Sequence, residues 1–266
     1  MTGKEEEMKD KTLGFIGGGR ITRIILEGFR RNGLEFPEVV VSDLDHGTLS
    51  RLQEKFPGLR ISPGDNRAPA RCDIVLLALH PPACPAVLDE IKGTLKPGAV
   101  LVSLAPKITI ARISERLGGF SRVIRMIPNA PSIIGAGYNP TALSPALSPR
   151  EREGLKGLFE ALGSCPEVPE KDLEAYAILA AMGPTYFWFQ WEELENLGAG
   201  FGLAREAARK ALSAMISGAA QTYFHSGRTG GEVVDLIPVK PLKDDEEDIR
   251  SRYRLRLGPL YDKIKP

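Results

Sequence analysis

The sequence predicts an α/β protein in which a doubly wound parallel sheet is followed by an all-helical segment. Short apolar runs alternate with helical patterns through the first half of the chain, which is typical of parallel strands covered by helices on both faces. A glycine-rich turn follows the first of these runs. Beyond Glu170 the pattern changes to long helical periodicity with no further strand signal.

The first half contains the expected sheet. The apolar runs that we expect to be strands are residues 12–16, 39–41, 73–79, 99–104 and 122–126. The helical patterns between them cover residues 21–31, 86–92 and 108–117. We therefore expect a disordered N-terminus over residues 1–11 and a first domain over residues 12–168.

The second half, residues 169–266, is expected to be a helical dimerisation and substrate domain. Its helical patterns cover residues 172–181, 185–197, 204–224 and 243–266, with a break at Gly198–Gly202. Aromatic side chains crowd the second of these segments, at Tyr186, Phe187, Trp188, Phe189 and Trp191. On a helix they point in all directions, so burial in a homodimer interface or a two-sided core is favoured over a ligand cage.

Composition excludes several classes of function. The 266 residues carry 35 basic and 34 acidic side chains, for a net charge of +1, so there is no cationic excess for nucleic acid. No apolar run approaches the roughly 18 residues of a membrane span, and the charged N-terminus lacks a signal-peptide core. Three scattered cysteines and three scattered histidines show no metal-ligand spacing. A cytoplasmic protein without a metal site is expected.

The glycine-rich turn predicts a dinucleotide site. Gly17, Gly18 and Gly19 follow a strand and lead into a helix that begins near Arg20 and Ile21. The first glycine allows a tight turn, and the third lets the backbone approach a pyrophosphate. The phosphates would then rest on the free N–H groups of the helix N-terminus. The context is that of a Rossmann-type domain.

An acidic residue follows the second strand, as this type of site requires. Ser42 and Asp43 stand at the strand end, where a carboxylate accepts hydrogen bonds from the adenosine ribose and repels a 2′-phosphate. The alternative is an ordinary turn that contains Asp. With the glycine turn upstream, we predict NAD(H) as the preferred cofactor and NADP(H) as the second option.

Three further segments narrow the choice of family. Asp65-Asn66 and Ala78-Leu79-His80-Pro81 are similar to the D-N and A-V-K-P-Q segments of the pyrroline-5-carboxylate reductase family. Residues 125–131 (RMIPNAP), followed by Gly135-Ala136-Gly137, resemble its R-x-M-P-N-x-P…G-x-G segment. Residues 180–186 (AAMGPTY) stand where the family has S-G-S-G-P-A-Y, and residues 202–208 match its paired dimerisation helices. The resemblance runs in order from about residue 13 to residue 227.

The resemblance implies reduction of the C=N bond of 1-pyrroline-5-carboxylate to L-proline, the last step of proline biosynthesis. It implies a homodimer joined through the C-terminal helices, with further assembly left open. By position, the residues that line the cofactor are Gly17–Ile21, Asn66, Ala78, Leu79, His80 and Pro81. Those beside the nicotinamide and the imine substrate are Asn129, Gly183, Pro184 and Thr185.

The chain departs from the family's pattern in four places. Asp43-Leu44 stands where the family often has Asn-Arg, and His80 replaces a lysine. Met182 and Thr185 alter the S-G-S-G-P-A loop. The family's V-T-S-P-G-G-T-T segment, which holds the substrate carboxylate, is not recognisable in residues 230–242. The last departure leaves the substrate open.

Thr185 and Asn129 are the candidate catalytic residues. An iminium is already activated, so orientation supplies most of the acceleration and a hydrogen-bond donor suffices. Thr185 is expected to donate to the reacting nitrogen or the substrate carboxylate; the alternative is a residue favoured at a helix start. Asn129 would position the nicotinamide or the substrate, or form a turn. His80 could stack on the nicotinamide ribose or occupy a turn without a role.

Other functions stay open at this point. A hydroxyacid dehydrogenase mechanism is disfavoured because its lysine acid/base has no counterpart between Lys171 and Lys210. A reductase of this scaffold could act on another cyclic imine or a carbonyl. A non-catalytic NAD-binding regulator would bind the nucleotide without turnover.

Overall fold

A computed structural model describes residues 10–266 of the chain. The disorder expected for residues 1–11 falls largely outside the described residues. By its internal contacts the chain divides into two compact units. The first comprises the chain up to Met182 together with Tyr261–Pro266, and the second comprises Gly183–Leu260.

The first unit is built around a parallel sheet. Within the described residues this sheet has seven strands in the order β3-β2-β1-β4-β5-β6-β8. They are Arg60–Ile61 (β3), Val39–Ser42 (β2), Leu13–Ile16 (β1), Ile74–Leu77 (β4), Val100–Ser103 (β5), Val123–Met126 (β6) and Thr141–Leu143 (β8). The order reverses between β1 and β4, which is the topological switch point where doubly wound sheets bind ligands. The predicted strands are confirmed.

The edge strand β8 is the antiparallel member of this otherwise parallel sheet. It pairs antiparallel to β6, with Arg125 opposite Ala142. The connection between β6 and β8, residues 127–140, contains a 3₁₀ helix at Ala130–Ile134 and the strand β7 (Gly137–Tyr138). β7 pairs in parallel with β9 (Gly163–Ser164).

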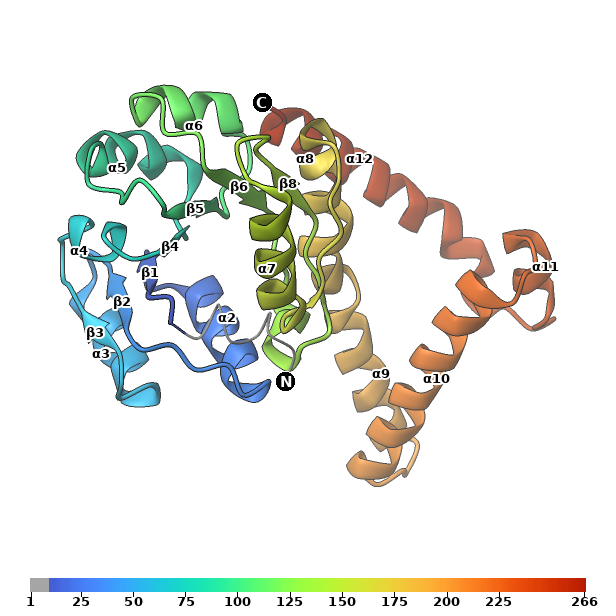
Figure 1. Ribbon diagram of the computed structural model, residues 1–266. Helices are drawn as coiled ribbons and strands as arrows, with labels where there is room; N and C mark the ends of the chain where they lie inside the picture. Colours follow the sequence, from blue (N-terminus) through green and yellow to red (C-terminus); the bar gives the residue numbers. More distant parts are fainter. Residues whose placement is uncertain (1–9) are drawn as a thin grey trace. The chain divides into compact units, whose positions relative to one another are not determined.

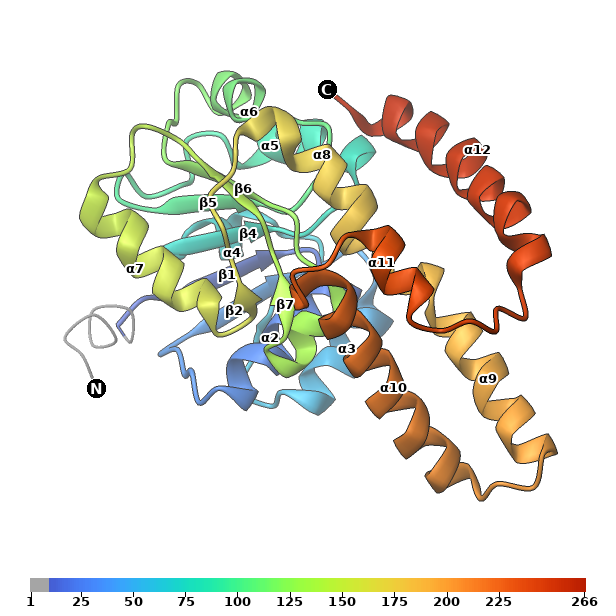
Figure 2. The same ribbon diagram turned by 90° about the vertical axis from the view of Figure 1, so that its right-hand side faces the viewer.

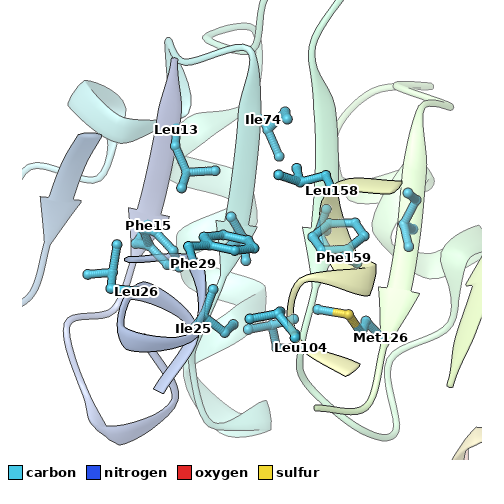
Figure 3. Close-up of a cluster of buried hydrophobic side chains, with 14 of the residues drawn as sticks. Leu13, Phe15, Ile25, Leu26, Phe29, Ile74, Leu104, Met126, Leu158 and Phe159 are labelled. Carbon is cyan, nitrogen blue, oxygen red and sulfur yellow. The ribbon is translucent and has the colours of Figure 1, made fainter. Parts of the chain in front are cut away.

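Helices cover both faces of the sheet (Figure 1). On one face lie α2 (Arg20–Arg31), α3 (His46–Lys55) and α7 (Pro149–Glu160), and on the other lie α4 (Arg67–Ala70), α5 (Cys84–Ile91) and α6 (Ile110–Arg116). α2 inserts Ile25, Leu26 and Phe29 into the first cluster, which also contains Leu158 and Phe159 of α7 (Figure 3). Each fully buried Leu, Ile or Phe side chain contributes about 1.5–3 kcal/mol. This double cover confirms the predicted fold class.

The chain between the sheet and the second unit is helical but irregular. A 3₁₀ turn at Glu170–Asp172 leads into α8 (Leu173–Tyr176), which continues as a π-helical segment over Ala177–Ala181. The helix predicted over residues 172–181 is thus present with wider turns at its end. Residues 183–186 form a separate 3₁₀ helix, because Pro184 has no N–H to continue the ladder.

The second unit is helical. Its helices are α9 (Trp188–Gly200), α10 (Arg205–His225), α11 (Gly230–Asp235) and α12 (Glu246–Ile264, whose last residues belong to the first unit). α9 and α10 form an antiparallel hairpin (Figure 2). The break predicted at Gly198–Gly202 lies later, at Phe201–Ala204, because Gly198 is a packing position: a Cβ there would lie 3.2 Å from the Cβ of Ala208.

Within the described part of the chain, no helix is both long enough and apolar enough to span a membrane. The same residues contain no group of three or more His, Cys, Asp or Glu side chains arranged to hold a metal ion.

Candidate functional site

The glycine turn lies at the carboxyl end of β1, beside the switch point. Gly17 has φ +103, and a Cβ on it would lie 2.4 Å from the carbonyl oxygen of Ala78. Only glycine meets both conditions, since its backbone adopts positive φ without strain. The Gly17 N–H donates to Ser42 O at 2.8 Å, and the Ala78 N–H donates to Ile16 O at 2.8 Å. The turn is therefore locked between the neighbouring strands.

Gly19 and the start of α2 form an open cradle. A Cβ on Gly19 would meet no atom within 4 Å. Gly19 is also the N-cap of α2; no side chain caps this helix, and its first turn carries no acidic residue. A helix N-terminus with free N–H groups and no nearby carboxylate in its first turn favours an anion. These features fit a dinucleotide pyrophosphate.

Thr22, in the first turn of α2, forms a hydrogen bond with the glycine turn. It stands where a glycine or alanine is usual in this motif, and it is fully buried. Its Oγ1 donates to Gly17 O at 2.5 Å. The larger side chain is thus accommodated by a hydrogen bond that the motif's smaller residues cannot make.

Asp43 lies directly beside the turn. Its Oδ2 accepts the Gly18 N–H at 2.8 Å, and its Oδ1 accepts the Asp45 N–H at 2.9 Å. Each carboxylate oxygen has a further lone pair, so these bonds leave acceptor capacity for ribose hydroxyls. The carboxylate is held in place by backbone donors before any ligand binds.

Ser42 and Asn66 form a polar pair behind Asp43. The Ser42 hydroxyl is fully buried and donates to Asn66 Oδ1 at 2.8 Å. The Asn66 amide in turn donates to Glu90 Oε2 at 2.8 Å. These two hydrogen bonds connect the end of β2 to Asn66 and Asn66 to α5. Ser42 and Asn66 therefore have a structural role in addition to the cofactor contact predicted for them.

The segment after β4 completes the edge. Ala78 and Leu79 are partly buried, His80 is exposed, and Pro81 begins a 3₁₀ helix that leads into α5. The His80 carbonyl accepts the Ala83 N–H at 3.0 Å. The structure therefore brings the predicted cofactor residues of β1, β2 and β4 to one edge of the sheet.

Asn129 follows β6 at the same edge and is 7 % exposed. Its Oδ1 accepts the Tyr138 N–H at 3.2 Å, and its Nδ2 lies 3.4 Å from Ala180 O. Its own N–H donates to Asn139 Oδ1 at 3.1 Å. The side chain ties the loop after β6 to strand β7 and to the helical connection.

The remaining predicted residues, Gly183, Pro184 and Thr185, lie in the 3₁₀ helix that begins the second unit.

A buried charge network in the first unit was missed by the sequence reasoning. Arg125 of β6 is fully buried and donates to Glu174 Oε1 and, at 3.2 Å, to Glu170 Oε1. Glu174 is fully buried as well and accepts the N–H of Lys107 at 2.8 Å. The signal was an arginine within the apolar strand Val123–Met126, because a buried charge requires a partner.

The network fixes an unusual turn after β5. Among the described residues Lys107 is the only non-glycine with positive φ, at 74°. A left-handed conformation costs a residue with a side chain about 1–3 kcal/mol. The bond from its N–H to Glu174 offsets part of this cost.

Comparisons with known proteins agree with this site. Residues 12–107 match the family model "NADP oxidoreductase coenzyme F420-dependent". The pyrroline-5-carboxylate reductase of Corynebacterium melassecola is 28 % identical over 225 residues, which cover 84 % of this chain and 83 % of that protein. The chain is thus similar to pyrroline-5-carboxylate reductases over most of its length.

Solved structures of pyrroline-5-carboxylate reductases share the fold over nearly the whole chain. The enzyme from Coxiella burnetii has a TM-score of 0.68 and 26 % identity, covering 96 % of this chain and 94 % of that chain. The Plasmodium falciparum enzyme, solved with NADP bound, has a TM-score of 0.73 and 21 % identity, covering 97 % and 95 %. The likeness thus includes the second unit as well as the sheet.

Proposed function

We propose that this protein reduces the C=N bond of 1-pyrroline-5-carboxylate to L-proline with a nicotinamide dinucleotide. The observation that carries the proposal is the open glycine cradle at the switch point, in a chain aligned over most of its length with pyrroline-5-carboxylate reductases. We also propose that the protein works in the cytoplasm, where thiols stay reduced. Burial raises the pKa of the free thiols of Cys72, Cys84 and Cys165 to about 11, which suits thiols without a redox role.

The residues at the nucleotide edge have distinct roles in this proposal. Gly17–Gly19 and the N-terminus of α2 hold the pyrophosphate, and the Asp43 carboxylate accepts from the ribose hydroxyls. The segment Ala78–Pro81 would line the nicotinamide half of the bound cofactor. When bound, the dinucleotide supplies the hydride. Because the Asp43 carboxylate repels a 2′-phosphate, we propose NAD(H) as the preferred cofactor.

The protein's own contribution to the chemistry is orientation. A protonated cyclic imine is electrophilic without further activation, and holding two reactants in line removes several kcal/mol of entropic cost. Thr185 donates a hydrogen bond to the substrate in this proposal. Asn129 acts as a positioning residue, since its amide already binds Tyr138 N–H and faces Ala180 O.

We further propose that the second unit assembles into a homodimer. In the single chain no residue of α9, α11 or α12 is buried, and α10 buries only Ala208. Phe201 and Phe224 are 81 % and 73 % exposed. Apolar surface of this extent is typical of an obligate interface. Sedimentation at micromolar concentration is expected to give twice the mass of one chain, and a monomer would contradict this part.

Steady-state kinetics test the function. NADH consumption is measured with 1-pyrroline-5-carboxylate, with 1-pyrroline, and with carbonyl analogues, and L-proline is quantified as the product. The proposal expects turnover that is highest with 1-pyrroline-5-carboxylate. Preferential turnover of another imine or a carbonyl would assign the scaffold to a different substrate. NADH binding without any turnover would indicate a nucleotide-binding regulator.

A further inference from the structure

A groove of about 570 Å³ lies within the second unit, between residues 185–190 and α12. Its walls include Thr185, Tyr186, Phe189, Arg252, Tyr253 and Arg256. The rings of Tyr186 and Tyr253 meet edge to face, with centroids 5.8 Å apart. This contact fixes α12 against the 3₁₀ helix that carries Thr185. The groove is therefore lined by aromatic rings and by two guanidinium groups.

The charge of the groove is of one sign. Arg252 and Arg256 lie one helical turn apart on α12, and no acidic residue lines the groove. Within residues 10–266, neither arginine lies within ion-pair distance of a carboxylate. Their neighbours on the same helix differ: Arg250 pairs with Glu246 at 3.6 Å, and Arg254 pairs with Glu247. The two unpaired arginines are thus the pair that faces the groove.

This arrangement favours a small anion with an apolar body. Two like charges at i and i+4 on one helix repel each other. A carboxylate bound between them is attracted to both guanidinium groups and also reduces their mutual repulsion. Guanidinium groups bind carboxylates through paired, charge-assisted hydrogen bonds. The aromatic walls give the rest of the ligand an apolar surface, as in most small-molecule sites.

We propose that Arg252 and Arg256 bind the carboxylate of the substrate in this groove, with its ring against Tyr186 and Tyr253 and its nitrogen toward Thr185. The proposal rests on the function proposed above, in which the substrate is a cyclic imine that carries a carboxylate. It makes the two arginines the residues that distinguish 1-pyrroline-5-carboxylate from an imine without a carboxylate.

Kinetics of Arg252→Gln and Arg256→Gln test this assignment. Removing one charge-assisted hydrogen bond is expected to raise KM for 1-pyrroline-5-carboxylate by about tenfold or more, because bonds to a charged group are stronger than neutral ones. The value of kcat and the affinity for NADH stay within about twofold, and KM for 1-pyrroline is unchanged. Arg254→Gln, on the same helix but outside the groove, is the matched control. A variant that changes the sedimentation mass, or an equal effect of the control, would overturn the assignment.

A binding measurement separates this inference from the proposed function. Cyclopentanecarboxylate has an apolar ring and a carboxylate but cannot be reduced, and its carboxamide is the neutral control. Titration calorimetry is expected to show binding of the carboxylate only, weakened about tenfold in Arg252→Gln and Arg256→Gln but not in Arg254→Gln. This result would support the groove even if the protein failed to reduce 1-pyrroline-5-carboxylate. No binding to the unaltered protein, or equal binding to all variants, would overturn it.

Discussion

Asp43 Oδ2 accepts the N–H of Gly18 at 2.8 Å. The carboxylate that would bind the ribose thus also fixes the turn that would bind the pyrophosphate. Gly17, which precedes Gly18, has a positive φ and lies against the carbonyl oxygen of Ala78, so only glycine fits at this position. The nucleotide edge is held in its shape by the fold itself, which reduces the cost of ordering it on binding.

Alanine substitutions separate the two roles of the glycine turn. In Gly19→Ala the new methyl group meets no protein atom within 4 Å, so the thermal midpoint stays within about 2 °C of that of the unaltered protein. The same methyl group intrudes on the pyrophosphate, so the Kd for NADH rises by about tenfold or more. Fluorescence titration and thermal unfolding measure both. An unchanged Kd for NADH would contradict the proposal that the pyrophosphate binds at Gly19.

Gly17→Ala tests the structural role of the turn, as Gly19→Ala tests its binding role. Its Cβ would lie 2.4 Å from Ala78 O at a backbone φ of +103, so we expect destabilisation by about 1–3 kcal/mol or more. Denaturant unfolding measures the loss. Stability equal to that of Gly19→Ala would contradict the structural difference between the two glycines.

Asp43→Asn tests cofactor choice. The amide oxygen retains an acceptor for the Gly18 N–H, but the negative charge is removed. We expect kcat/KM for NADPH to rise by about tenfold relative to that for NADH, which corresponds to about 1.4 kcal/mol. Asp65→Asn removes a nearby carboxylate, which accepts the Arg67 N–H at 3.0 Å, and serves as the control. If both variants shift the ratio equally, Asp43 has no specific role.

The strands and the glycine turn were predictable from the sequence because their signals are local. Short apolar runs of three to seven residues mark these buried parallel strands, and Asp43 follows β2 at the expected place. The short strands β7, β8 and β9 have two or three residues each and leave no periodic signal. Helix α7 had a readable start, with Ser148 and Glu151 forming a capping box, but it was not predicted.

Parts of the site depend on contacts that local patterns do not encode. Arg125 and Glu174 lie 49 positions apart, and the sequence alone does not indicate that they meet. Gly198 was interpreted as a helix break, whereas it admits the close approach of Ala208. Likewise, the sequence alone does not show that Arg250 and Arg254 pair with carboxylates whereas Arg252 and Arg256 line the groove.

The buried pair Arg125–Glu174 is expected to couple strongly. Arg125→Met leaves Glu174 buried without its guanidinium partner, which costs about 3–5 kcal/mol. The double variant Arg125→Met/Glu174→Gln is expected to be less destabilised than the sum of the single variants by about 1–3 kcal/mol. Urea unfolding of the four proteins completes the cycle. Additive losses would mean that the pair contributes no direct interaction.

The capping carboxylate of α7 predicts a pH dependence of stability. Hydrogen bonds from Arg122 and Ser148 lower the pKa of Glu151 from 4.5 to about 2. A carboxyl with a lowered folded-state pKa stabilises the fold above its unfolded pKa, and this stabilisation is lost as pH falls from about 4.5 toward 2. Glu151→Gln should therefore be less stable than the unaltered protein at pH 7, with a difference that shrinks below pH 4.5. A difference independent of pH would contradict this.

Label transfer tests the central claim most directly. The protein is incubated with 1-pyrroline-5-carboxylate and NADH deuterated at the nicotinamide C4 on the transferred face, and the proline formed is analysed by mass spectrometry and NMR. We predict one deuterium per proline, on the carbon that was doubly bonded to nitrogen, and a much lower yield of labelled proline in Gly19→Ala at limiting NADH. Unlabelled proline, or none, with both faces of the cofactor tested, would contradict hydride transfer to this substrate.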